Sequence, residues 1–174
     1  MIKVNNIYLV GPMGAGKTSV GKHLARQLSW EFCDTDQTIE KQSGVNISWI
    51  FDIEGEDGYR RRETQAIEHL TQERNIILAT GGGSVVEDEN RKLLSQHGTV
   101  IYLRLSIDEQ VSRTEKNRDN RPLLQVDDLQ KTIEVLMAER DPLYSEIADI
   151  TIETNNRSVA AVVDDIVEQL QSYP

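Results

Sequence analysis

The sequence of residues 11–18 is GPMGAGKT, and this stretch lies between a short apolar run at residues 7–10 and a segment with helical periodicity. It matches the pattern G-x-x-x-x-G-K-[ST] of phosphate-binding loops, in which glycines let backbone N–H groups point at phosphate oxygens. The start of the following helix adds positive potential. In such loops the lysine, here Lys17, reaches the β- and γ-phosphates, and the hydroxyl of Thr18 ligates Mg²⁺. The sequence therefore predicts a nucleotide site between the first strand and the first helix.

The composition limits the class of protein to which the chain belongs. Its 174 residues fit one domain with a sizeable core. The net charge of −10 argues against a general nucleic-acid or anionic membrane surface, because both partners would be repelled. The single cysteine, Cys33, excludes an internal disulfide and is interpreted as a packed thiol in a reducing compartment. Since no apolar run could span a bilayer and no secretory pattern opens the chain, we expect a soluble cytoplasmic protein.

Extended apolar runs alternate with segments of helical periodicity along the chain. Strands are expected at residues 7–10, 31–33, 75–80, 100–105 and 149–154. Ser106 and Ser158 follow the last two of these runs and are expected to cap helices. Strand–helix alternation implies a mostly parallel sheet with right-handed crossovers, so the predicted fold class is α/β.

Two polar segments interrupt this alternation. Residues 46–63 separate the second strand from the next helix, and residues 112–128 form a charge-dense segment between two helices. We interpret them as a substrate-side insertion and a lid insertion. Trp49 and Phe51 in the first segment are expected to be packing residues that could also wall a substrate pocket.

Two carboxylates follow the second strand, in the stretch Asp34-Thr35-Asp36. Ligands of open α/β sheets collect beyond the carboxyl ends of the strands. Asp34 could therefore hold a water bound to Mg²⁺, while Asp36 could face a hydroxyl nucleophile as a base or as an orienting group. The alternative is an ordinary turn or helix cap.

Three glycines, residues 81–83, end the third strand, where many phosphate-loop proteins would place an acidic residue. Help in metal binding must then come from elsewhere, and Asp34 is the candidate. Consecutive glycines lose much conformational freedom on folding, and they allow close approach of the backbone to a ligand or a positive φ. We expect substrate contact through Gly82, with a bare turn as the alternative.

Positive charge gathers in residues 55–63, which lead into the helix before the third strand. Adjacent helical residues point in different directions, so three neighbouring arginines cannot share one site. Arg60 is the better candidate for gripping an anionic substrate, and Arg61 and Arg62 are expected at the surface. Glu63, one turn later, could orient Arg60 or form an ordinary surface ion pair.

Six motifs occur in order along the chain: the phosphate loop, Asp34-Thr35-Asp36, Gly-Glu-x-x-Tyr-Arg-x-x-Glu at 55–63, the triple glycine, Arg121-Pro122-Leu123-Leu124 and Arg140-Asp141-Pro142-Leu143-Tyr144. In the order and spacing of these motifs the chain resembles shikimate kinase. The resemblance covers essentially the whole chain. It implies a P-loop fold like that of nucleoside-monophosphate kinases, with helices flanking a five-stranded parallel sheet. It further implies one kinase domain over residues 1–174, with a substrate-binding insertion at about 35–62 and a lid at about 112–128.

The resemblance also implies an activity. Shikimate kinases transfer the γ-phosphate of ATP to the 3-hydroxyl of shikimate, a step of aromatic amino-acid biosynthesis, with Mg²⁺ as cofactor. The implied partners are shikimate and ATP, with no nucleic acid and no membrane, and the family points to a monomer. Two rival activities remain open: another small-molecule kinase of the same fold, such as a gluconate kinase, and a nucleotide-dependent switch without transfer activity. The aspartate pair together with Arg60 and Arg140 favours shikimate over gluconate.

Carried onto matching positions, the resemblance assigns roles to individual residues. The nucleotide phosphates would be held by Gly14, Ala15, Gly16, Lys17, Thr18 and Ser19. Mg²⁺ would be held by Thr18 and, through water, by Asp34. Shikimate would be held by Asp36, Arg60, Gly82 and Arg140. Lys17, Asp36 and Arg121 would be catalytic, whether Asp36 takes a proton or only orients the hydroxyl.

Two arginines are implied on the nucleotide side, and the chain departs from the family pattern at two places. Arg113 and Arg157 would contact the adenine side, and Arg121 would close over the phosphates as part of the lid. The departures are Tyr59, where phenylalanine is common, and a lid without glycine between Arg113 and Arg121.

Overall fold

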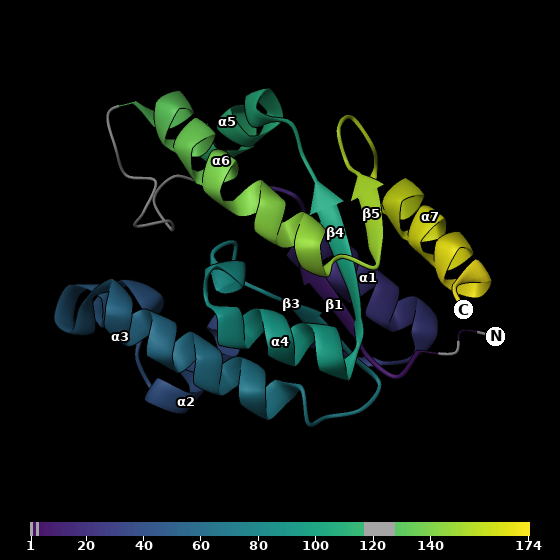
Figure 1. The fold of residues 1–174 in the computed structure, drawn as a ribbon, viewed down its shortest axis with the longest axis horizontal. Helices are drawn as coiled ribbons and strands as arrows, with labels where there is room; N and C mark the ends of the chain where they lie inside the picture. The colour runs from purple at the N-terminus through teal and green to yellow at the C-terminus, as the bar shows by residue number, and fades with distance from the viewer. Residues whose placement is uncertain (1, 3, 117–127) are drawn as a thin grey trace.

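A five-stranded parallel sheet forms the centre of the protein, seen in a computed structural model that describes residues 2, 4–116 and 128–174 (Figure 1). The strands are β1 (Ile7–Val10), β2 (Glu31–Asp34), β3 (Ile76–Ala79), β4 (Thr99–Arg104) and β5 (Ile150–Glu153). Their order across the sheet is β2-β3-β1-β4-β5, and all four pairings are parallel. The five predicted strands are confirmed, and their ends differ from the prediction by at most one residue.

Helices cover both faces of this sheet. They are α1 (Lys17–Leu28), α2 (Thr35–Ser43), α3 (Ile47–Leu70), α4 (Asp88–His97), α5 (Ile107–Glu115), α6 (Leu129–Ile147) and α7 (Val159–Ser172), with a short 3₁₀ turn, η1 (Ser84–Val86). The expected caps are confirmed, since Ser106 accepts a hydrogen bond from the N–H of Glu109, and Ser158 accepts one from the N–H of Ala161. Among the described residues, no helix combines the length and the apolar composition that a membrane crossing requires.

Alternate residues of the strands build two cores, one on each face. Ile7 and Leu9 of β1 belong to the core under α1 and α7. Tyr8 and Val10 of the same strand face the opposite core, to which α3, α4 and α6 contribute. Because side chains alternate along a strand, the nearly continuous apolar sequence of β1 fits burial on both faces.

Because the strands are parallel, the loops that follow β1, β2 and β3 lie at the same edge of the sheet. β1 lies between β3 and β4, with the strands that follow it first, β2 and β3, on one side and the later strands, β4 and β5, on the other. Ligands of open α/β sheets bind at such a switch point, beyond the carboxyl ends of the strands. The first loop residue, Gly11, has φ 146°, and a Cβ there would lie 2.5 Å from the carbonyl oxygen of Leu103 in β4. Only glycine lets the phosphate loop leave the sheet so close to the neighbouring strand.

The segment 46–63 differs from the expectation that it separates the second strand from a later helix. Helix α3 already begins at Ile47, capped by Asn46, and the chain kinks at Gly55, where φ is 71° and ψ is −178°. The first half of α3 packs against α2 in a small separate core that contains Ile39 and Ile50. The expected late start of this helix is therefore wrong, because two short helices joined at Gly55 replace the loop.

Candidate active site

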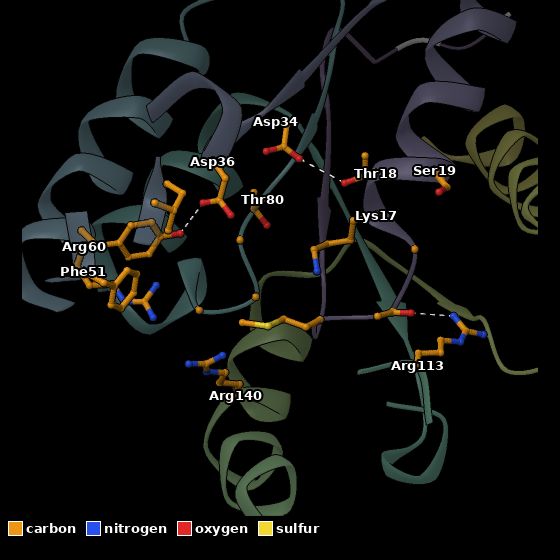
Figure 2. A pocket seen from close by; sticks show the side chains of 18 of the residues that line it. Lys17, Thr18, Ser19, Asp34, Asp36, Phe51, Arg60, Thr80, Arg113 and Arg140 are labelled. Carbon is orange, nitrogen blue, oxygen red and sulfur yellow. Dashed lines mark hydrogen bonds between the residues drawn. The ribbon is translucent and has the colours of Figure 1, made fainter. Parts of the chain in front are cut away.

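A cleft of about 510 Å³ opens at the carboxyl edge of the sheet (Figure 2). The predicted site residues that line it are Gly14, Gly16, Lys17, Thr18, Ser19, Asp34, Asp36, Arg60, Gly82, Arg113 and Arg140. Ala15 of the loop is buried, and Arg121 lies outside the described residues, as does most of the predicted lid. The cleft therefore joins the phosphate loop to candidate substrate groups from several separate elements.

The phosphate loop ends at the N-terminus of α1. Gly16 is the residue before the helix and has φ 89°, so the loop turns sharply there. The ammonium of Lys17 donates to the carbonyl oxygens of Gly11 and Pro12, at 2.6 and 2.9 Å. The first turn of α1 contains no acidic residue, so the positive potential of the helix end is not cancelled there. These features suit the binding of phosphate groups.

Thr18 and Asp34 form an oxygen-rich corner beside the loop. The Thr18 hydroxyl donates to one Asp34 oxygen at 3.3 Å, and the other oxygen caps α2 by accepting from the N–H of Gln37 at 3.1 Å. The helix-cap reading of Asp34 is thus correct, and the same carboxylate also faces the cleft. Hydroxyl and carboxylate oxygens are ligand types that Mg²⁺ accepts, together with waters and phosphate oxygens, so this corner fits the ion.

Asp36 lies at the start of α2, half-buried in the cleft wall. One of its oxygens accepts a hydrogen bond from the Tyr59 hydroxyl at 2.7 Å. Burial raises the pKa of Asp36 to about 6, an effect that the bond from Tyr59 opposes and the nearby carboxylates of Asp34 and Glu63 increase. A carboxylate with this pKa is ionised at neutral pH and is a stronger base than an ordinary aspartate.

Arg60 is held by a buried partner. Its guanidinium donates to Glu63 at 2.8 Å, and the Glu63 side chain is fully buried. The other Glu63 oxygen accepts from the Ser84 hydroxyl at 3.1 Å and lies 3.1 Å from the Tyr59 hydroxyl. The Arg60–Glu63 pair is therefore an internal orienting contact and not a surface ion pair. Sequence reasoning missed Ser84, and its only signal for Tyr59 was the departure from the family's phenylalanine.

The triple glycine makes room for this network. A Cβ at Gly81 would lie 2.8 Å from a Glu63 oxygen, and a Cβ at Gly83 would lie 2.7 Å from Nη1 of Arg60. At Gly82 a Cβ would lie 3.4 Å from Met13 and 3.7 Å from the carbonyl oxygen of Gly11. None of the three glycines has a positive φ, so close contact with other groups explains glycine at positions 81 and 83. The outer two accommodate neighbouring side chains, and Gly82 lines the cleft.

Arg140 approaches the same cleft from α6 (Figure 2). Its side chain is largely buried, and its Nε has no hydrogen-bond partner among the described residues. Buried polar groups are normally satisfied, so a guanidinium with an unused donor beside a cleft is suited to receiving an anion. Arg60 and Arg140 thus offer two positive groups from different elements, α3 and α6.

The two arginines expected near adenine lie in different surroundings. Arg113 of α5 lines the cleft and donates to the carbonyl of Gly14 at 2.8 Å. Arg157 donates to Asp165 at 3.0 Å and to nearby backbone carbonyls, and it is not among the residues that line the cleft. The structure brings the first of these arginines to the phosphate loop and places the second outside the residues that line the cleft.

The aromatic residues of α3 also differ from each other. Phe51 lines the cleft and packs against the Tyr59 ring, with 4.7 Å between ring centroids, so it fulfils the expectation of a pocket wall. Trp49 is 46% exposed, and its expected role as a packing residue is wrong.

Comparisons with known proteins agree with the geometry of the cleft. A family model for shikimate kinase matches residues 13–171. Shikimate kinase of Legionella pneumophila (strain Paris) is 52% identical over 170 residues, which cover 98% of this chain and 97% of the relative. That of Francisella tularensis subsp. novicida (strain U112) is 53% identical over 167 residues, covering 95% and 94%.

Comparison with solved structures also shows similarity to a shikimate kinase. Shikimate kinase from Acinetobacter baumannii in complex with shikimate superimposes with a TM-score of 0.95 at 46% identity, covering 98% of this chain and 95% of that one. A gluconokinase from Sinorhizobium meliloti gives a TM-score of 0.64 at 16% identity, covering 96% and 91%, which shows a shared fold alone.

Proposed function

Because this chain belongs to the shikimate kinase family, we propose that it transfers the γ-phosphate of ATP to the 3-hydroxyl of shikimate. The products are shikimate 3-phosphate and ADP, in the pathway to aromatic amino acids. The observation that carries the proposal is the single cleft in which a phosphate loop faces two arginines, Asp36 and Gly82. A cytoplasmic location, expected from the composition of the sequence, and a monomeric state, expected from the resemblance, are part of the same proposal.

Shikimate is an anion that carries several hydroxyl groups, and the far part of the cleft supplies partners for both. Arg60 and Arg140 would bind the carboxylate, since guanidinium groups match its planar geometry. The backbone at Gly82 and the free oxygen of Asp36 would bind hydroxyl groups. Asp36 would then lie against the hydroxyl that attacks, where it accepts the proton or orients the nucleophile.

On the nucleotide side, the loop residues Gly14 to Ser19 would surround the phosphates, with Arg113 at the adenine side. Phosphoryl transfer needs positioning and charge neutralisation more than covalent chemistry, which Lys17 and the N-terminus of α1 would supply. Mg²⁺, held by Thr18 and through water by Asp34, supplies further neutralisation of phosphate charge when it is bound. The roles proposed for Arg121 and Arg157, closing over phosphates and contacting the adenine side, rest on the family resemblance.

ADP release is the direct test of this function. Purified protein with ATP and Mg²⁺ is given shikimate, gluconate or no acceptor, and the phosphorylated product is identified by mass. We expect turnover that depends on shikimate, with little ADP released in its absence. ADP release with gluconate alone, or release that needs no acceptor, would show that the proposed substrate is wrong.

The contact between Gly83 and Arg60 leads to a prediction about substrate binding. In the variant Gly83→Ala the new methyl group displaces the guanidinium, so the KM for shikimate should rise about tenfold while the KM for ATP stays within about twofold. Steady-state kinetics with each substrate varied in turn measure both constants. In an Arg60→Ala background the same substitution should add nothing, and an additive effect there would contradict this explanation.

The raised pKa of Asp36 predicts an acid limit to activity. Only the ionised carboxylate can accept a proton from the attacking hydroxyl, and protonation removes that ability as the pH falls. Since burial raises this pKa to about 6, kcat/KM for shikimate should be level near pH 7 to 8 and fall below about pH 6, approaching a tenfold loss per pH unit. A pH profile at saturating ATP and Mg²⁺ tests this, and a kcat/KM that falls only near pH 4 would contradict it.

A further inference from the structure

Tyr144 is a fully buried tyrosine whose hydroxyl reaches the wall of the cleft. It lies one turn after Arg140 on α6, and its side chain has no exposed surface. The hydroxyl donates a hydrogen bond to the carbonyl oxygen of Gly82, in the triple glycine after β3. This bond links α6 directly to the glycine that lines the cleft.

The same hydroxyl lies beside the guanidinium of Arg140. Burial raises the pKa of Tyr144, and the neighbouring charge of Arg140 opposes that rise. Tyr144 and Arg140 also border a small cavity next to Met13 of the phosphate loop. The Tyr144 side chain therefore binds the backbone of Gly82 and lines the same small cavity as Arg140, although Gly82 and Arg140 come from distant parts of the sequence.

The ring of Tyr144 is fixed from the other side. It packs against Tyr102 of β4, with 5.0 Å between the ring centroids and 34° between the planes. The hydroxyl of Tyr102 donates to Asp141, the neighbour of Arg140, at 2.6 Å. Pro142 lies in this turn and has no N–H to donate to the helix, so side-chain contacts take a larger part in holding the backbone here.

We infer that Tyr144 is a positioning residue for the proposed reaction, and that its hydroxyl holds the Gly82 peptide and the Arg140 guanidinium at a fixed separation before shikimate binds. The inference rests on the proposed function. A site whose polar groups are already in place loses less conformational freedom on binding, so the substrate binds more tightly. Tyr144 acts through these two groups and not by touching the substrate.

The test is the variant Tyr144→Phe, which keeps the ring and removes the hydroxyl. We expect the KM for shikimate to rise about tenfold and the KM for ATP to change by less than about twofold, because the phosphate loop keeps its own contacts. Binding of shikimate without nucleotide, measured by calorimetry, should weaken by a similar factor. If the hydroxyl only stabilised the fold, its removal would lower the melting temperature and the fraction of active enzyme, and the KM for shikimate would not rise more than the KM for ATP.

Tyr8→Phe is a matched control. Tyr8 is equally buried, belongs to the same core, and donates to the carbonyl of His97 at 3.1 Å, away from the cleft. This variant should lower the melting temperature and leave both KM values unchanged. KM does not depend on how much of the enzyme is folded, so the comparison remains valid even for a partly unfolded variant.

The outcomes separate this inference from the function on which it rests. Turnover of shikimate by the wild type, together with an unchanged KM for shikimate in Tyr144→Phe, would overturn the inference alone. Failure of the wild type to phosphorylate or bind shikimate would overturn the proposed function and the inference with it. An equal rise of both KM values would also count against the inference, because it would place the effect outside the pair of Gly82 and Arg140.

Discussion

The variant Lys17→Met is expected to lower kcat by about 10³-fold, the largest effect predicted for a single substitution in this protein. Methionine keeps the length of the side chain and removes its charge. In the structure the ammonium lies at the N-terminus of α1, directed into the cleft beside the loop carbonyls (Figure 2). The transferring phosphoryl group is surrounded by negative oxygens, and without Lys17 a main compensating charge is lost.

Lys22→Met provides the matched control for this loss. Lys22 lies one turn further along α1, is exposed, and does not line the cleft, so its replacement removes the same charge from the same helix. Its kcat should stay within about twofold of the wild type. Melting curves of both variants report on the fold, and a Lys17→Met enzyme that is folded and retains a tenth or more of the activity would refute the assigned role.

The variant Asp36→Asn is expected to lower kcat by about 10²-fold. Asparagine has nearly the same shape and can still accept a hydrogen bond, but it cannot take a proton. The amide offers one acceptor oxygen in place of two, and the Tyr59 hydroxyl already donates to one of the carboxylate oxygens at 2.7 Å, so the local network must rearrange. The acid limb of the pH profile should disappear in this variant, because the group responsible for it is gone.

Comparison with Asp52→Asn separates this role from a general effect of charge. Asp52 is exposed on α3, outside the cleft, and its replacement should leave kcat and the pH profile unchanged. Rates of product formation at saturating substrates give kcat for both variants. If Asp36→Asn loses less than about tenfold, Asp36 orients the hydroxyl and does not abstract its proton.

The architecture of the sheet could be predicted from the sequence because its signals are local. Each strand is a short apolar run, and the phosphate loop identifies the turn after the first of them. The helix between Asn46 and Glu63 was not recognised, because the many charged residues around Gly55 hide the periodicity of two short helices that meet at an angle. Sequence patterns describe straight elements better than kinked ones.

The candidate site was predictable where residue type alone points to a role. Asp36, Arg60 and Gly82 were chosen for their chemistry and Arg140 through the family resemblance, and the structure brings all four to one cleft. The residues that hold them in place were not predictable in the same way. Two interpretations of Glu63 were left open, Ser84 carried no signal, and Tyr144 was noted only as the last residue of the motif at 140–144. The contacts that make Ser84 and Tyr144 important are with residues far away in the chain.

The close contact of the triple glycine with α3 also restricts how this enzyme can be altered. Gly81 and Gly83 lie against Glu63 and Arg60, so a side chain at either glycine needs a matching change on the helix. Among related sequences these positions should covary and not drift singly. A directed-evolution library aimed at a new acceptor should therefore vary the triple glycine and the facing residues of α3 together. Most single replacements at these positions would give an inactive protein before a compensating second replacement is sampled.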